Sequence, residues 1–398
     1  MMHKKSSGMI VVFALMVLSI IILLTEQLLR SVRVGTGFIN TMVQREHAEI
    51  LALGGINLAV AQLSVNKSDP AKKQKKSSTD QSDKKGMPTA PTSSEGEEAQ
   101  KLTPMQQFIG MLLPNLNRWQ TFQLTSKADE MEGQVKICVV SEHGKINLNR
   151  IFDFQKQEMK KEYEFLLKGL EIPGRVPLGE LYNRIFEFLK KRGKPLYDVS
   201  ELMAISGIDT LDIFYHPPEI VGKKKEGIVN NVLTLQDIFT LWTTDEKLHP
   251  LLLSDSMCMI FGLRRPHADD AQRLKDRFKQ VAAAFKPDWG SNWEANWKFL
   301  DPLYEQKPKL LKELTPLFSK KFSPKVYSVL SYGKVGQVEQ RVLAIIKEIN
   351  ENQIEHNNEE RVQDDQKQPK PNKESSKEKQ DKKNQKKKTF KIVRLYWL

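Results

Sequence analysis

The sequence predicts an α+β fold: one long N-terminal helix packed on a small antiparallel sheet, with a large all-α domain inserted between strands. Two observations predict it. Residues 9–63 keep apolar or small side chains at helical spacing along their whole length. Several later stretches are rich in β-branched and aromatic residues with strand-like alternation, and stretches of helical periodicity lie between them.

The first half of the long helix has the composition of a membrane span. Met9 to Thr25 carries no charge, and at about 1.5 Å per residue it nearly crosses a hydrocarbon core of about 30 Å, with help from residues 27–29. Lys4 and Lys5 precede it, so we expect the N-terminus on the cytoplasmic side. No small-x-small cleavage site follows the apolar run, which argues against an ordinary signal peptide.

The second half of the helix carries a stripe of small residues suited to close packing against another helix. Apolar side chains accompany the stripe at helical spacing, which indicates one continuous helix of some fifty residues that projects beyond the membrane. The stripe consists of Ala48, Ala52, Gly55 and Ala59.

Strands and helices alternate along the rest of the chain. Strands are expected at residues 133–140, 231–242, 325–334, 338–349 and 389–398. Helices are expected at residues 155–170, 178–191, 199–206 and within 269–317, with Asp198 or Ser200 as the capping residue of the third. The glycine turn in "LMAISGID" is also typical of a helical hairpin, a module that in some proteins binds the DNA backbone.

Two low-complexity runs contain many of the lysines behind the formal net charge of +13. They span Asn66–Lys101 and Asn357–Lys388, and both mix Lys, Ser, Gln, Asp, Glu and Pro with almost no large apolar residues. Such segments bury too little surface to fold, so we interpret them as disordered linkers. A tail that binds nucleic acid or lipid is the alternative.

The composition argues against an enzyme. No Ser-His-Asp, CxxC, HExxH or P-loop pattern is present, and the seven histidines lack the spacing of metal ligands. Two cysteines, Cys138 and Cys258, exclude a disulfide-rich scaffold and a cysteine zinc cluster. They form either one bridge or two separately buried thiols.

Two further clusters have both a functional and a structural interpretation. Trp289, Trp293 and Trp297 are four residues apart and share a helical face, as either a partner interface or a packing stripe. The turn "EHGKINLN" offers Glu142, Asn147 and Asn149 as calcium ligands, or as residues that cap the backbone of the turn.

The N-terminus resembles that of type IV pilins and pseudopilins. A short basic leader ends in Gly8, an apolar run begins at Met9, and a long helix follows. The resemblance implies cleavage after Gly8 by a prepilin peptidase, with Met9 as the mature first residue. Most such subunits carry a glutamate at the fifth mature position, where this chain has Phe13. A subunit at the tip has no further neighbour with which to pair that carboxylate.

A missing glutamate is typical of the minor pseudopilin K family of type II secretion systems. The segments 45–63, 132–153, 190–215 and 322–348 and the closing "KTFKIVRLYWL" are similar to that family. The resemblance implies a pilin-like sheet, a tip heterotrimer with two other minor pseudopilins, processing by prepilin peptidase, a single-pass inner-membrane anchor and a periplasmic globular part. It also implies calcium as a cofactor that could bind in the globular part, with no ligand set that transfers to this chain.

The expected organisation follows from the patterns and the resemblance together. It comprises a leader at 1–8, the helix at 9–63, a linker at 64–101, the first β segment at 102–149, an α domain at 150–230, a strand and return at 231–264, a second helical insert at 265–320, closing strands at 321–350 and 389–398, and a charged insertion at 351–388. A subunit of a type IV or DNA-uptake pilus and a simple single-pass envelope anchor are the alternative functions.

Overall fold

The structure is a computed structural model of the 398-residue chain. It describes residues 6–65, 103–129, 132–169, 179–208, 234–263, 271–286, 288–304, 308, 311–350 and 388–398. Most of both low-complexity runs, and the second half of the glycine-turn hairpin, lie outside these residues. Within them the fold is α+β and pilin-like, with a long N-terminal helix and an antiparallel sheet, as the sequence predicted.

A five-stranded antiparallel sheet forms the centre of the molecule. Its strands lie in the order β1-β2-β7-β8-β9, and every neighbouring pair is antiparallel. The β7–β8 hairpin turns at Gly336, whose positive φ of 57° suits glycine. The strands are β1 Trp119–Leu124, β2 Gly133–Ser141, β7 Val326–Val335, β8 Val338–Asn350 and β9 Lys388–Trp397.

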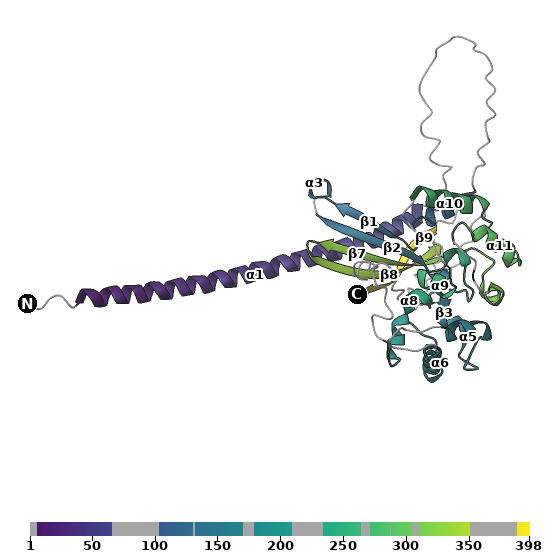
Figure 1. The fold of residues 1–398 in the computed structure, drawn as a ribbon, viewed down its shortest axis with the longest axis horizontal. Coiled ribbons are helices and arrows are strands. Elements are labelled where there is room, and N and C mark those ends of the chain that lie inside the picture. Colours follow the sequence, from purple (N-terminus) through teal and green to yellow (C-terminus); the bar gives the residue numbers. More distant parts are fainter. Residues whose placement is uncertain are drawn as a thin grey trace, which may run out of the picture.

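The helix α1, Ser6–Val65, packs its C-terminal half along one face of this sheet. Its N-terminal half projects away from the rest of the chain, as the purple helix in Figure 1 shows. From Leu51 onward the buried residues of α1 share one hydrophobic core with residues of β2, β7 and β8, while Leu330, Tyr332 and Leu343 form a second, smaller cluster. The sheet and the second half of α1 therefore form two layers packed face to face.

A mostly helical insertion separates β2 from β7 and lies at the end of the sheet far from the N-terminus (Figure 1). It also holds two small sheets, one pairing β3 with β6 in parallel and one pairing β4 with β5. Its strands are β3 Ile146–Asn147, β4 Phe152–Asp153, β5 Glu158–Met159 and β6 Phe239–Thr240.

The helices of the insertion are short, and several have polar caps. Asp198 caps the N-terminus of η3, and Glu201 completes the capping box. Of the two candidate capping residues, Asp198 and Ser200, the structure therefore shows Asp198. The elements are η2 Glu142–Gly144, α4 Leu148–Ile151, α5 Lys161–Lys168, α6 Glu180–Arg192, η3 Val199–Ala204, α8 Leu235–Ile238, η4 Pro250–Leu252, α9 Asp255–Ile260, α10 Ala271–Ala284, α11 Trp293–Leu300, α12 Leu311–Leu314 and η5 Thr315–Leu317. Outside the insertion are α2 Pro104–Leu112 and α3 Ser126–Asp129.

The strand expected at residues 231–242 is wrong in the described part, residues 234–242. This segment forms the helical turn α8 and then the two-residue strand β6, which pairs with β3 and not with the main sheet. Leu235, Ile238 and Phe239 are all buried, and their spacing of three and four is helical. A short apolar run fits either period, so tertiary packing decided the outcome.

The two cysteines are both buried and are not joined by a disulfide. Cys138 lies on β2, whereas Cys258 lies on α9 in the insertion. Of the two interpretations of the sequence, two separately buried thiols is the one that the structure shows.

Candidate functional site

The first half of α1 exposes apolar side chains on every side. From Val11 to Val43 all large hydrophobic residues of the helix are at least 40% exposed, among them Phe13. In water such a surface would be strongly unfavourable, and an isolated helix of this kind needs lipid or other helices around it. Among the described residues, α1 is the one helix long and apolar enough to cross a membrane.

Several polar side chains in this half form hydrogen bonds within the helix. Ser19 donates to the carbonyl of Leu15 at 2.8 Å, and Thr25 donates to that of Ile21 at 2.8 Å. Glu26 and Arg30 form an ion pair of 2.9 Å just past the apolar run. A hydrocarbon environment requires such internal hydrogen bonding, because it offers no water to polar groups.

The second half of α1 buries its small residues against its own sheet. Ala48, Ala52, Gly55 and Ala59 are buried, and the stripe expected to pack on partner helices is therefore corrected. A β-carbon on Gly333 of β7 would lie 2.0 Å from the carbonyl oxygen of Ala48. The small residues let the backbones of α1 and β7 approach this closely, so the sheet already occupies their surface.

Gly55 meets the sheet in the same way from the helix side. A β-carbon there would lie 2.1 Å from Ser331 Oγ and 2.9 Å from side-chain atoms of Val135 and Ile137. Gly54, one residue earlier, has nothing within 4 Å of such an atom. The two neighbouring glycines therefore mark the inner and the outer side of α1.

The predicted processing site lies in the helical backbone at the start of α1. Gly8 and Met9 follow the first described residue, Ser6, within the helix. Phe13 is 68% exposed on this helix. Peptidase cleavage and a tip position stay predictions.

The three tryptophans do not form a surface. Trp289, Trp293 and Trp297 are at most 5% exposed, so of the two interpretations of their spacing the structure shows the packing stripe and not the partner interface. Trp289 also precedes α11 instead of belonging to it. Trp293 and Trp297 pack against Phe318, with ring centroids 5.0 and 5.8 Å away, and this aromatic cluster holds the insertion together.

The three weak calcium candidates do not converge on one point. Asn147 Nδ2 donates to the carbonyl of Thr243 at 2.6 Å, and its Oδ1 accepts from the amide of Asn149 at 3.0 Å. Asn149 bonds both the amide and the carbonyl of Leu196, each at 2.8 Å. The asparagines therefore fasten the turn to the insertion, and of the two interpretations of this turn the structure shows the one in which the asparagines bond the backbone.

The third candidate, Glu142, belongs to a buried polar network that the sequence did not reveal. Lys145 Nζ donates to Glu142 Oε1 at 2.5 Å and to Ser328 Oγ at 3.1 Å. Thr240 Oγ1 donates to Glu142 Oε2 at 2.5 Å. The side chains of Glu142 and Lys145 are only 2% exposed, so each charge depends on the other. In the described part of the chain no three His, Cys, Asp or Glu side chains are placed to hold a metal ion.

A second buried carboxylate lies beside this network. Asp237 Oδ2 accepts from the amide of Ser256 at 2.8 Å, and burial raises the pKa of the Asp237 carboxyl above its usual range. The charge of Lys145 acts in the opposite direction on that pKa. Sequence patterns gave little indication of this network. Lys145 is one lysine among many, and although Glu142 is only three residues away, Ser328 and Thr240 are far away along the chain.

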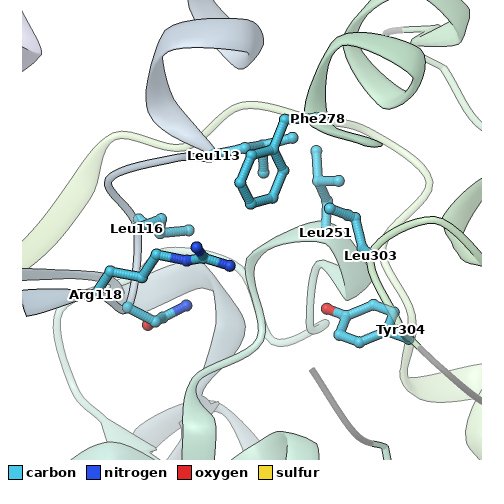
Figure 2. A pocket seen from close by; sticks show the side chains of 8 residues that line it. Leu113, Leu116, Arg118, Leu251, Phe278, Leu303 and Tyr304 are labelled. Atoms are coloured by element: carbon cyan, nitrogen blue, oxygen red, sulfur yellow. The ribbon is translucent and has the colours of Figure 1, made fainter. Parts of the chain in front are cut away.

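The pocket in Figure 2 is too small for a ligand larger than water. It has a volume of about 30 Å³ and lies among Leu113, Leu251, Phe278, Leu303 and Tyr304. The guanidinium of Arg118 lies 5.0 Å from the centre of the Phe278 ring. We interpret the pocket as a packing defect where the insertion meets the segment before β1.

No protein-family model matches this chain, and no curated protein is significantly similar to it. Among solved structures, a chain in the crystal structure of the GspK-GspI-GspJ complex from the enterotoxigenic Escherichia coli type 2 secretion system is similar at 13% identity. The match covers 78% of this chain and 93% of that chain, with a TM-score of 0.35. A TM-score this low carries no argument about the present chain.

Proposed function

We propose that this chain is a minor pseudopilin of a type II secretion system that caps the tip of the periplasmic pseudopilus. The observation that carries the proposal is the contrast within α1. Its first half is apolar and exposed on all sides, whereas its second half packs one face against the sheet of the same chain. Such a helix is suited first to lie in a membrane and then to pack among similar helices.

The location of the insertion supports a place at the tip. It lies at the end of the sheet opposite to the exposed half of α1 (Figure 1), where it leaves that half accessible to other helices. A body of this size would obstruct a further subunit stacked beyond it. The phenylalanine at position 13 fits the same place, because a tip subunit has no outer neighbour with which to pair a buried carboxylate.

Assembly in this proposal is an association of helices and not a reaction. The partners are two other minor pseudopilins, with prepilin peptidase acting earlier and the inner membrane holding the helix until extraction. Methylation of the new N-terminus and a periplasmic globular part belong to the same proposal. The small-residue stripe around Ala52 is buried against the sheet, so the partner subunits contact the exposed half of α1 instead.

The test is the mass of the mature protein. We expect intact-mass spectrometry of the full chain, from cells with active prepilin peptidase, to show loss of residues 1–8 and a new N-terminus at Met9. Gly8→Leu should block processing, whereas Ser7→Ala, one residue earlier, should not. An unprocessed wild-type chain in cells that process another pseudopilin would contradict the proposal and favour a simple envelope anchor.

A further inference from the structure

A cleft of about 710 Å³ lies where the insertion meets the far end of the sheet. Four separate segments line it: the turn η2, residues 242–247 after β6, residues 318–326 before and into β7, and the end of β8. This volume lies in the range of ligand-binding clefts and is far larger than the pocket in Figure 2.

The rim of the cleft is strongly basic. Five exposed lysines stand against two carboxylates, those of Asp245 and Glu348. Within the described part of the chain no ion pair holds any of these lysines, and the ammonium group of Lys320 donates to Ser291 Oγ at 2.7 Å. The lysines are Lys247, Lys320, Lys321, Lys325 and Lys347.

Hydrogen bonds hold the inner wall of the cleft in place. His143, whose side chain is only 8% exposed, lies 3.3 Å from Asp245 through Nδ1 and accepts from the amide of Lys325 at 3.1 Å through Nε2. The carbonyl of Lys325 in turn accepts from the amide of Glu348 at 2.7 Å. The bond from His143 lowers the pKa of the Asp245 carboxyl, which therefore stays charged.

The floor of the cleft is apolar. Trp242 is half-buried and Phe318 is buried, and both line the cleft. The Thr240 hydroxyl oxygen accepts from the amide of Trp242 at 3.2 Å, which fixes the backbone below the indole. A ring of positive charge around aromatic side chains favours an occupant that is both anionic and partly apolar.

We propose that this cleft binds an acidic, partly apolar peptide segment of a partner protein. Its carboxylates contact the lysines, its apolar side chains pack on Trp242, and its backbone N–H groups face Asp245 and Glu348. The phosphates of a nucleic acid have no donors for those two carboxylates. A peptide therefore fits the charges of the cleft better than a polyphosphate does.

Membrane lipid is too far away to occupy the cleft. The contacts of α1 with β7 run from Gly336 beside Gln44 to Ser331 beside Gly55, so Val326 and the cleft lie toward the C-terminal end of α1. From Leu24 to Leu63 the helix rises about 60 Å. The inference goes beyond the assembly role, because the cleft is remote from the exposed half of α1 and needs no contact there.

The test is binding of a fluorescent synthetic peptide of alternating glutamate and phenylalanine to the full chain in detergent, followed by anisotropy. We expect saturable binding that weakens as salt rises and that is lost with the peptide in which glutamine replaces glutamate. The double variant K325Q/K347Q should raise the dissociation constant about tenfold. Both lysines are exposed, so circular dichroism should be unchanged.

The matched control is K275Q/K298Q, which removes the same charge from exposed positions on α10 and α11. It should bind the acidic peptide as the wild type does. Equal loss in both double variants, or equal binding of the glutamine peptide, would overturn the proposal. So would single-stranded DNA or an anionic phospholipid in the same detergent that competes as effectively as the peptide, because the cleft would then attract any polyanion.

Discussion

Two seams of opposite chemistry connect β7 to the rest of the molecule, one on each face of the sheet. On one face the helix seam brings Ala48, Ala52 and Gly55 of α1 against Gly333 and Ser331. The polar seam on the other side joins Lys145 and Glu142 to Ser328 of β7 and to Thr240 of the insertion.

The two seams differ in the kind of substitution that should disrupt them. The helix seam depends on the absence of side-chain atoms, so it should fail when volume is added. The polar seam depends on matched charges in a site without water, so it should fail when one partner is removed. The predictions below test this contrast, from the largest expected effect to the smallest.

The largest effect is expected from Lys145→Met in the polar seam. Glu142 would remain buried with only the Thr240 hydroxyl as donor, and an uncompensated buried charge costs about 3–5 kcal/mol. Denaturant unfolding of the full chain in detergent measures the loss. The double variant Lys145→Met/Glu142→Gln should recover much of it, because no charge is then left alone. Equal losses in the two variants would show that packing, and not charge, holds this seam.

The next largest effect is expected from Gly333→Ala in the helix seam. The new β-carbon would meet the backbone of α1 at Ala48 and Ala52, neither of which can turn away, and we expect a loss of about 3 kcal/mol in the free energy of unfolding. Gly54→Ala is the control on the outer side of the same helix, where the added atom meets nothing. It should stabilise the chain by about 1 kcal/mol through helix propensity. The contrast between the seams fails if the two variants are equally stable.

The smallest effect is expected from lowering the pH by one unit, and it concerns His249 in the insertion beside the polar seam. Burial, with a smaller contribution from His143, lowers the pKa of His249 to about 3. In the unfolded chain His249 is protonated below about pH 6.5, whereas in the folded chain it is protonated only below about pH 3. Stability is therefore complete above pH 6.5 and should fall by about 1.4 kcal/mol per pH unit below it.

Subtracting the profile of His249→Asn isolates this histidine. Asparagine keeps an oxygen that can cap η4, where His249 Nδ1 now accepts from the amide of Leu251. Asp237 titrates in the opposite sense, because a raised pKa in the folded state removes stability as pH rises, and it remains in both chains. Parallel profiles for the wild type and the variant between pH 6.5 and 4 would contradict the assignment.

Much of the sheet could be predicted because its strands are long and alternate clearly. The strands expected near residues 133–140, 325–334, 338–349 and 389–398 are β2, β7, β8 and β9. The short strand β1 was missed, since six residues such as "WQTFQL" give a weak pattern. Residues 234–240 were assigned to the wrong element, because an apolar run of that length fits a helical turn as well as a strand.

The candidate sites were harder to predict because spacing says nothing about what a face will meet. The tryptophans and the small-residue stripe were both recognised as unusual, and both turned out to be covered by the chain itself. Conversely, the lysines of the basic cleft come from three segments that no local pattern connects.

The sequence by itself determined the long apolar helix, the strand-rich core and the helical insertion, because hydrophobic periodicity is a local property that survives without context. Only the tertiary structure decided which surfaces are used. It placed Gly333 against α1, set Lys145 beside Glu142, and gathered the lysines around Trp242. The helix contact and the cleft join residues that are far apart in the chain. Lys145 and Glu142 are only three residues apart, but their pair is buried and bonded to Ser328 and Thr240 only when the sheet and the insertion are formed.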